Sequence, residues 1–322
     1  MPGCRVCFDA SRPAEARPPP PQPHLVAQPR SNLLPYLAIF VGILATGFSA
    51  LFVRWAAAPG PVTGFYRMGL ASLALAPFAL VRRGGRQAWP RPGLLLAALG
   101  GLSLALDLSL WNTSVNMTRA ANAALLGNTA PLWVALGAWL LFRERLTGRF
   151  WLGLGLTLAG AAAVAGADFL LNLQFGWGDL LGLGAGLFYG GYYLCTQRGR
   201  GYLDPLQYVW TAGTVSAVML LVISTALRLP LTGYPVQSYL AFLGAALVTQ
   251  VLGYVSVAYA LGHLPASVVS PSMVGQPLVT AILGIPLLGE WLSPIQWLGG
   301  ATVLIGILLV HRSRAPAISH IA

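Results

Sequence analysis

The sequence predicts an all-α membrane protein with ten transmembrane helices, arranged as two five-helix repeats of opposite orientation in the membrane. Three observations lead to this prediction. The 322 residues are 56% apolar and only 8% charged, with a mean hydropathy of +0.70. Apolar stretches of about 20 residues, each long enough to cross a bilayer, recur along nearly the whole chain. Finally, one long stretch of the chain occurs twice.

The duplication joins residues 119–164 to residues 265–310, which align without a gap after a shift of 146 positions. Of the 46 aligned positions, 13 are identical, where roughly four or five matches are expected by chance in segments so rich in Leu, Ala and Gly. The more informative matches are Pro131 with Pro277, Glu144 with Glu290, Trp151 with Trp297, Gly153 with Gly299 and Gly160 with Gly306. Each copy is predicted as an apolar helix with a central proline, a Glu-x-Leu turn and a second apolar helix.

Helices are the expected spanning structure, because the segments lack the alternation of a membrane-barrel strand. The ten expected spans are 33–53, 61–81, 93–112, 120–142, 150–167, 177–196, 206–227, 236–261, 266–289 and 292–311. Their connections are too short for a soluble domain. We divide the chain into a proline-rich tail expected to be disordered (1–32), a first repeat (33–167), a second repeat (176–312) and a short C-terminal tail (313–322).

The arginines predict the orientation of the chain. All 19 basic residues are arginines, and 15 of them fall on the side that also holds the N-terminal tail. Cytoplasmic connections collect positive charge, so both termini are expected in the cytoplasm. The same pattern accounts for the net charge of +11 without a nucleic-acid partner. Since each repeat has five helices, the second is inverted, which places the turn at Glu144 inside and its copy at Glu290 outside.

Inverted repeats of this kind are a transporter architecture, in which the substrate is held near mid-membrane between the two halves. The sequence has no metal, phosphate-binding or nucleophile motif. Cys4-x-x-Cys7 lacks a second ligand pair, and the four histidines are scattered. We therefore expect no metal site, no cofactor and no catalytic residue.

The motifs resemble those of the drug/metabolite transporter superfamily, in its ten-helix EamA-type branch. The residues concerned are Glu144-Arg145-Leu146, its copy Glu290-Trp291-Leu292, the run 118–124 that leads to Pro131, and Phe65-Tyr66-Arg67. The resemblance covers residues 33–312 and implies two EamA-like repeats. It also implies a cavity lined mainly by the first, third, fourth, sixth, eighth and ninth helices, with the fifth and tenth at the periphery. Similar proteins export amino acids, other small metabolites or drugs.

Asp107 is the only carboxylate deep inside a predicted span, and an intramembrane acid is by default a candidate functional group. It shares a face of the third helix with Trp111 and Ser114. Two interpretations stay open: Asp107 binds a proton or a substrate amine, or it neutralises Arg67 as a structural charge pair. Arg67 itself can capture a carboxylate, or extend to the membrane interface.

Polar and aromatic side chains at helical spacing predict a cavity suited to zwitterionic or aromatic solutes, although such rings also serve helix packing. The predicted substrate-binding residues are Asp107, Trp111, Asn122, Thr129, Tyr189, Tyr193, Gln250, Tyr254, Ser270 and Gln276. Pro131 and Pro277 each remove a backbone hydrogen bond and are predicted as hinges or gates. Glu144 and Glu290 are predicted as structural acids that tie a helix end to the N-terminus of the next helix.

These observations together predict a secondary transporter of the plasma (bacterial inner) membrane that exports amino acids or similar small metabolites by alternating access. Its expected partners are the small-molecule substrate and the lipid bilayer, in which it works as a monomer or a homodimer. A multidrug or lipophilic-cation exporter of the same superfamily is the alternative. A more remote alternative is an intramembrane enzyme acting on lipid, for which the sequence offers no nucleophile–base set.

Overall fold

The computed structural model describes residues 33–81, 89–117, 126–165, 176–288 and 293–313. Over this part of the chain every regular element is a helix, and the predicted all-α class is confirmed. The elements of the first half are α1 (Leu34–Gly47), α2 (Ser49–Ala56), α3 (Gly60–Val81), α4 (Arg91–Met117), α6 (Ala130–Phe142) and α7 (Gly148–Ala165). Those of the second half are α9 (Trp177–Gly199), α10 (Pro205–Ala226), α11 (Val236–Gly244), the π-helix η1 (Ala245–Tyr254), α12 (Val255–Leu261), α13 (Ala266–Met273), α14 (Gln276–Leu288) and α15 (Pro294–Arg312). The N-terminal tail and residues 314–322 lie outside the described residues.

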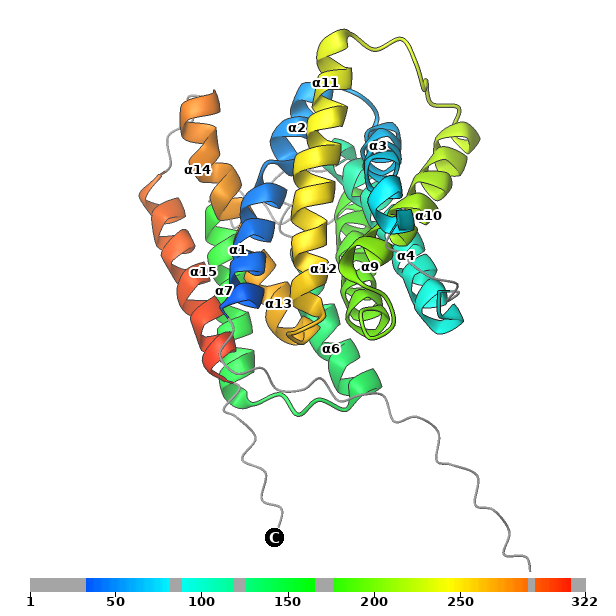
Figure 1. The fold of residues 1–322 in the computed structure, drawn as a ribbon. Helices are drawn as coiled ribbons and strands as arrows, with labels where there is room; N and C mark the ends of the chain where they lie inside the picture. The colour runs from blue at the N-terminus through cyan, green and yellow to red at the C-terminus, as the bar shows by residue number, and fades with distance from the viewer. Residues whose placement is uncertain (1–32, 82–88, 118–125, 166–175, 289–292, 314–322) are drawn as a thin grey trace, which may run out of the picture.

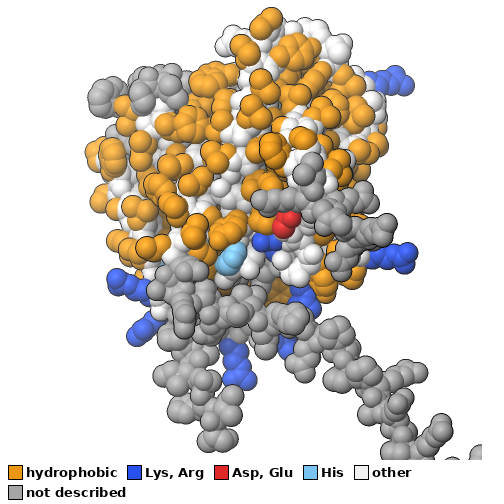
Figure 2. Space-filling view, viewed as in Figure 1, with side chains coloured by type: hydrophobic (Ala, Val, Ile, Leu, Met, Phe, Trp, Pro, Cys, Tyr) orange, Lys and Arg blue, Asp and Glu red, His pale blue; other side chains and the backbone are white. Residues whose placement is uncertain are grey.

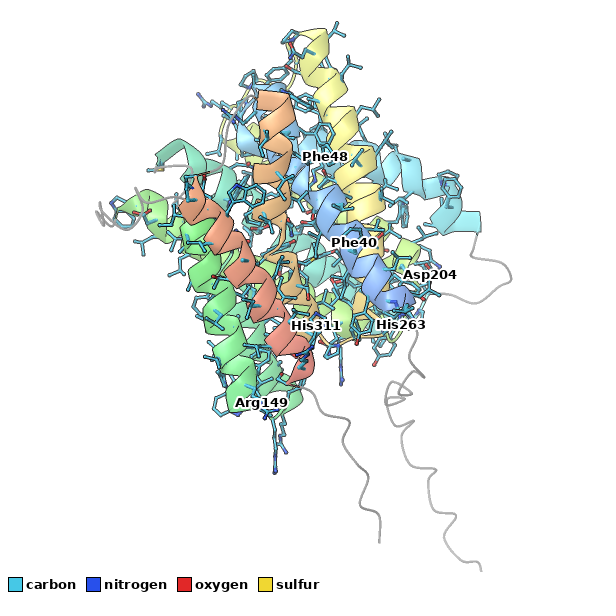
Figure 3. The ribbon with its side chains drawn as sticks, turned by 90° about the vertical axis from the view of Figure 1, so that its left-hand side faces the viewer. Phe40, Phe48, Arg149, Asp204, His263 and His311 are labelled. Atoms are coloured by element: carbon cyan, nitrogen blue, oxygen red, sulfur yellow. The ribbon has the colours of Figure 1, made fainter. Side chains whose placement is uncertain are left out.

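The helices stand side by side in one bundle (Figure 1), and the first and last of them meet at one end. The ring of Tyr36 near the start of α1 lies 5.6 Å from the ring of His311 near the end of α15. We call this end the tail face and the opposite end, where α2 and α11 lie in Figure 1, the far face. Figure 3 shows Arg149 and His263 toward the tail face as well. The bundle therefore has two distinct ends.

The flank of the bundle is apolar, as a lipid-facing surface requires. Figure 2 shows it covered by hydrophobic side chains, while most of the visible arginines gather at the tail face. Five helices in the described residues are long and apolar enough to cross a membrane: Leu34–Ala56, Arg91–Ser114, Pro205–Ala226, Val236–Leu261 and Pro294–Arg312. Two shorter apolar helices are Ala130–Phe142 and Gly148–Val164. The arrangement is that of a polytopic membrane protein.

Helix packing separates a central group from a peripheral pair. α4 packs along α9, and α10 packs against both α3 and α4. α7 and α15 pack closely on each other at one side of the bundle (Figure 1), and they run in opposite directions. Glycines at their interface allow the backbones of the two helices to come into contact. The fifth and tenth helices thus lie at the periphery, as the family resemblance implied.

Two of the expected long helices are interrupted near their prolines. The ninth expected span consists of α13 and α14, separated by a turn at Val274–Gly275. In the fourth, α6 starts only after a turn at Asn128–Thr129. We predicted Pro131 and Pro277 as bends within continuous helices, but each occupies the second position of a new helix. A proline fits there because the first turn of a helix leaves its N–H groups unbonded.

The first and eighth spans are also irregular. α1 and α2 are separated at Phe48, and the carbonyl of Gly47 accepts a hydrogen bond from Thr280 Oγ1 of α14 at 2.7 Å. The eighth span contains η1, and π-helices frequently occur at functional sites. η1 packs tightly on α1, because a Cβ added to Gly253 would lie only 2.9 Å from Thr46 Cγ2. The irregular segments of these helices therefore lie in contact.

Candidate functional site

Polar and aromatic side chains from five elements meet inside the bundle. They are Ser49 of α2, Arg67 of α3, Asp107 of α4, Tyr189, Tyr192 and Tyr193 of α9, and Gln250 and Tyr254 of η1. We call these residues the central cluster. Arg67 is 5% exposed, Asp107 8% and Gln250 1%, so both charges are buried. Charged groups at membrane depth are costly and typically functional.

Arg67 is held by neutral partners. Its Nη1 donates to Ser49 Oγ at 3.1 Å and its Nη2 to Gln250 Oε1 at 3.2 Å. The guanidinium carbon lies 5.2 Å from the centre of the Tyr254 ring, within cation–π distance. The enclosed Nε has no acceptor among the described residues. The guanidinium is therefore held in place by neutral groups, and no carboxylate of the described residues forms a direct ion pair with it.

Asp107 contributes the opposite charge to the central cluster. It is close enough to Arg67, Tyr189 and Tyr254 to interact with them electrostatically. Within the described part of the chain it makes no hydrogen bond and no direct ion pair, and the bonds of Arg67 go to Ser49 and Gln250. The structure thus brings the predicted pair close enough for an electrostatic interaction, without a direct bond between the two side chains in the described residues.

Four tyrosines form the aromatic side of the cluster. Tyr193 donates its hydroxyl hydrogen to the Tyr189 hydroxyl at 3.1 Å, and their ring centres are 4.8 Å apart. The ring of Tyr192 lies 5.6 Å from that of Tyr254. The Tyr192 hydroxyl is enclosed without a partner among the described residues. These rings, most of them tilted against one another, offer apolar faces together with hydroxyl groups.

Glycines next to these tyrosines bring α6 close to α9. A Cβ added to Gly190 would lie 2.9 Å from Trp133 Cβ, and one on Gly186 would lie 2.5 Å from Thr129 Oγ1. Both positions require glycine, because neither neighbouring atom can move aside easily. The Cβ of Trp133 is fixed to the backbone, and the Thr129 hydroxyl is held by its own hydrogen bond. The start of α6 therefore supports the helix that carries Tyr189, Tyr192 and Tyr193.

Other predicted binding residues lie away from the contacts of the central cluster described above. Trp111 is half-buried against Gly127, while Thr129 donates to the Leu126 carbonyl at 2.6 Å and accepts from Trp133 Nε1 at 3.3 Å. These groups serve the helix interruption before α6. Asn122 lies outside the described residues.

The two predicted residues of the ninth span lie on either side of its interruption. Ser270 of α13 is 2% exposed, and its hydroxyl has no partner in the described part of the chain. α13 packs against Tyr193 through Val269 and Met273. Gln276 is half-buried at the start of α14. Ser270 is therefore a buried hydroxyl on the helix that packs in one cluster with Tyr193.

Glu144 ties two helices together at the tail face. Its Oε2 accepts a hydrogen bond from Ser267 Oγ at 2.7 Å, and Gln197 Oε1 accepts from the backbone N–H of Ala266 at 2.7 Å. Both bonds reach the first turn of α13. The bond to Ser267 joins Glu144 to α13, because the end of α6 packs beside that helix. Glu144 makes a further interaction, and its predicted tie to the next helix, α7, stays a prediction. Glu290 lies outside the described residues.

Arg200 adds a second contact at this face. Its Nε donates to the Ala258 carbonyl of α12 at 2.8 Å, and its Nη1 donates to the Leu203 carbonyl. Burial lowers the pKa of the Arg200 guanidinium to about 10, and the nearby Asp204 opposes that shift. Arg200 therefore joins the α9–α10 turn to the end of α12.

Sequence reasoning missed Ser49 as a member of the central cluster. Ser49 is one polar residue in a run of apolar ones, and its bond to Arg67 crosses two helices. No pattern in the sequence marks Ser49 as a partner of Arg67. Tyr192, which lies between the predicted residues Tyr189 and Tyr193, was not among the predicted binding residues.

A model of the EamA-like transporter family matches the chain twice, over residues 33–166 and 176–312. The chain belongs to the EamA-like transporter family. The predicted resemblance is thereby confirmed, and the protein is a multi-pass membrane protein of a family whose members transport small molecules. The two matches cover the two halves that contribute to the central cluster.

Several curated relatives of this transporter are themselves named transporters. The uncharacterized transporter YwfM of Bacillus subtilis (strain 168) is 26% identical over 230 residues, which are 71% of this chain and 75% of that protein. A probable terminal-alkyne amino-acid exporter of Streptantibioticus cattleyicolor is 26% identical over 246 residues, covering 76% and 82%. An uncharacterized transporter of Archaeoglobus fulgidus is 25% identical over 276 residues, covering 85% and 95%.

One solved crystal structure of a protein has the same fold. The two superpose with a TM-score of 0.71, over 86% of this chain and 96% of the other, at 17% sequence identity. At this identity the likeness concerns the fold alone.

Proposed function

We propose that this transporter exports amino acids or similar small zwitterionic metabolites across the plasma (bacterial inner) membrane, by alternating access between its inverted halves. The observation that supports the proposal is the arrangement of Arg67 and Asp107. Both side chains are buried, one is a base and the other an acid, and they do not bond each other in the described structure. A zwitterion presents the complementary pair of charges.

The chemistry of the cluster fits an α-amino acid. Its carboxylate accepts hydrogen bonds from the guanidinium of Arg67, whose Nε lacks another acceptor, and its ammonium group binds Asp107. Each buried charge is costly while it is unpaired, and the bound solute compensates both at once. The rings of Tyr189 and Tyr254 then face the substrate's side chain. Asp107 is also the group that we propose for proton coupling.

The name of one relative supports export, and the charge pattern supports the orientation of the chain in the membrane. One relative is named a probable amino-acid exporter. Seven described arginines lie at helix ends of the tail face, which is the distribution of a cytoplasmic face: Arg91, Arg143, Arg145, Arg149, Arg198, Arg200 and Arg312. We therefore place both termini in the cytoplasm and the far face outside.

The helix interruptions fit a role in gating. We propose that Pro131 and Pro277 mark hinges, since each begins a half-helix that can tilt without breaking a backbone bond of its own. The bonds of Glu144 and Gln197 to the first turn of α13 then hold the cytoplasmic side closed. Opening toward the cytoplasm requires both bonds to break.

Reconstitution into liposomes tests this proposal. Vesicles preloaded with one unlabelled amino acid should accumulate the same radiolabelled amino acid by counterflow, and empty control vesicles should not. The assay is repeated with and without an imposed pH gradient to detect proton coupling. If a complete set of amino acids gives no counterflow in protein that remains folded, the proposed substrate class is wrong.

A lipophilic-cation or multidrug exporter is the second candidate, and the aromatic rings favour it. Four tyrosines beside Asp107 can hold a cation by ring contacts and one charge. Against this candidate, the buried positive charge of Arg67 would repel a cationic substrate in the same site. Tetraphenylphosphonium that inhibits counterflow competitively, and is itself transported, would favour this candidate over an amino-acid exporter.

A further inference from the structure

We infer that Gln250 sets the charge selectivity of the site: it orients Arg67 through a neutral oxygen and so leaves the guanidinium charge available to an anionic group of the solute. The inference rests on the proposed function, which it deepens by assigning a specificity-determining residue. Gln250 acts on the substrate through Arg67, so it is a positioning residue.

The environment of Gln250 fixes its side chain on Arg67. Gln250 is 1% exposed, and its Oε1 accepts from Arg67 Nη2 at 3.2 Å. The surrounding π-helix is held against α1 on both sides of Gln250. Thr249 Oγ1 donates to the Ala45 carbonyl at 3.5 Å, and Gly253 approaches Thr46 closely. These contacts hold the backbone of Gln250 in place, and the bond to Arg67 orients its buried amide.

The neutrality of this acceptor determines what Arg67 can bind. A buried arginine is commonly matched by a carboxylate, which cancels the charge in a bidentate pair. Here both bonded nitrogens have neutral acceptors, Ser49 at one end and Gln250 at the other. Asp107 interacts with the guanidinium only through space. The positive charge is thus oriented by two hydrogen bonds and remains uncancelled.

Gln250→Glu changes this balance while it conserves the shape of the side chain. The new carboxylate pairs with Arg67, and the formal charge of the three side chains at 67, 107 and 250 changes from zero to minus one. The site should then lose affinity for solutes with a carboxylate and gain relative affinity for amines. Gln250→Met removes the acceptor without adding charge, so it should weaken carboxylate binding without creating a preference for amines.

The test compares three solutes that share a phenylethyl core: phenylalanine, phenethylamine, which lacks the carboxylate, and 3-phenylpropionate, which lacks the amine. Each is used in two assays, inhibition of counterflow in proteoliposomes and ligand-induced thermal stabilisation of the purified protein. Gln237→Glu is the matched control, because it makes the same substitution at an exposed position in the first turn of α11, on the same span.

For Gln250→Glu we expect the KM for phenylalanine to rise about tenfold or more, as expected when a charged partner is lost from a buried site. Maximal velocity should change less, and phenethylamine should become the best of the three ligands. Gln237→Glu should keep the wild-type order. A Gln250→Glu protein that is folded, keeps the wild-type order and changes its KM less than about threefold would overturn the inference.

A second variant keeps the inference testable if Gln250→Glu fails to fold. Ser49→Asp places a carboxylate at the other end of the guanidinium and should cause the same change of order. If Ser49→Asp is folded and leaves the order unchanged, the inference is wrong. Failure of the proposed function gives a different result: wild type then does not prefer phenylalanine over both analogues, yet the Glu and Asp variants still shift preference away from the acid.

Discussion

Gly153 of α7 and Gly306 of α15 meet backbone to backbone. A Cβ added to Gly153 would lie 2.9 Å from the Gly306 carbonyl oxygen, and a Cβ added to Gly306 would lie 2.7 Å from the Gly153 carbonyl oxygen. About two helical turns away, Gly160 and Gly299 approach each other in the same way. A Cβ added to Gly160 would lie 2.7 Å from the Gly299 carbonyl oxygen, and a Cβ added to Gly299 would lie 2.8 Å from the Gly160 carbonyl oxygen. No larger residue fits at any of the four positions unless the helices separate.

The identities of these glycines show the symmetry of the fold. The repeat aligns Gly153 with Gly299 and Gly160 with Gly306. Exchanging the two copies therefore converts the Gly153–Gly306 contact into the Gly299–Gly160 contact, which is the property of a two-fold axis between antiparallel helices. The two repeats are related by an axis that passes between α7 and α15, as inverted repeats require.

The glycine contact should be sensitive to substitution. Gly160→Leu must push α7 away from α15, because the new side chain meets the backbone atoms Val303 N and Gly299 O. We expect a loss of about 1–3 kcal/mol of stability, seen as a lower melting temperature of the purified protein. Gly155→Leu is the control, since a Cβ there meets nothing within 4 Å. Equal effects of the two variants would contradict the packing described here.

Arg67→Lys retains the positive charge but cannot bond Ser49 and Gln250 in the same planar geometry. We expect the KM for amino-acid counterflow to rise about tenfold, which corresponds to roughly 1.4 kcal/mol. Arg54→Lys is the control, because Arg54 is exposed in the last turn of α2. A normal KM in the Arg67 variant would show that the guanidinium does not hold the substrate.

Asp107→Asn distinguishes a functional acid from a structural charge pair. Because Asp107 has no direct bond to Arg67 in the described structure, we expect the variant to express and to elute as a single species in size-exclusion chromatography. Amino-acid counterflow should fall about tenfold or more, because the variant loses the carboxylate that binds the ammonium group of the substrate. Aggregation of the variant, with the remaining folded fraction transporting normally, would support the structural interpretation instead.

The tie between Glu144 and Ser267 can be measured with a double-mutant cycle. Both side chains make further contacts, so the single variants Glu144→Ala and Ser267→Ala report more than this bond. The coupling between them isolates it, and we expect about 1–2 kcal/mol for a charge-assisted hydrogen bond. Thermal unfolding of the four proteins supplies the values. Additive effects within about 0.3 kcal/mol would mean that the bond contributes nothing.

Two arginines in left-handed backbone conformations test the orientation. Arg143 (φ 53°) follows α6 at the tail face, and Arg228 (φ 52°) follows α10 at the far face; both are exposed. Each is replaced by cysteine in a chain whose three native cysteines have been removed. A membrane-impermeant maleimide added to intact cells should label position 228 and not position 143. Labelling of both from outside would contradict the inverted topology.

Much of the fold could be predicted from the sequence because lipid imposes simple requirements. Apolar length located the helices, and Pro205–Ala226 and Val236–Leu261 fall within one residue of the expected spans. The helix interruptions were predicted only approximately. A proline signals a break, but whether the break falls at the proline or before it depends on neighbours such as Thr129, whose hydroxyl caps the Leu126 carbonyl.

The candidate site was less accessible to sequence reasoning. Asp107 and Arg67 stood out because charges are rare in apolar helices. Gln250 was among the predicted binding residues, but its bond to Arg67 was not predicted, because the two residues lie 183 positions apart in the chain. Ser49 was not predicted, because it carries no distinguishing pattern. The π-helix that carries Gln250 and Tyr254 was also invisible, since its apolar composition is that of an ordinary helix. Long-range pairing of this kind requires the three-dimensional structure.

The early positions of Pro131 and Pro277 in α6 and α14 affect the energetics of any movement. Bending an intact helix in hydrocarbon would strip carbonyl and amide groups of their partners in a medium that offers no replacement. Here the helix interruptions before Pro131 and Pro277 are already part of the folded structure. The free energy of leaving their backbone groups without helical partners therefore belongs to folding and not to the transport cycle. In each transport cycle α6 and α14 can then tilt as intact helices, and the energy barrier to this movement is set by the repacking of side chains.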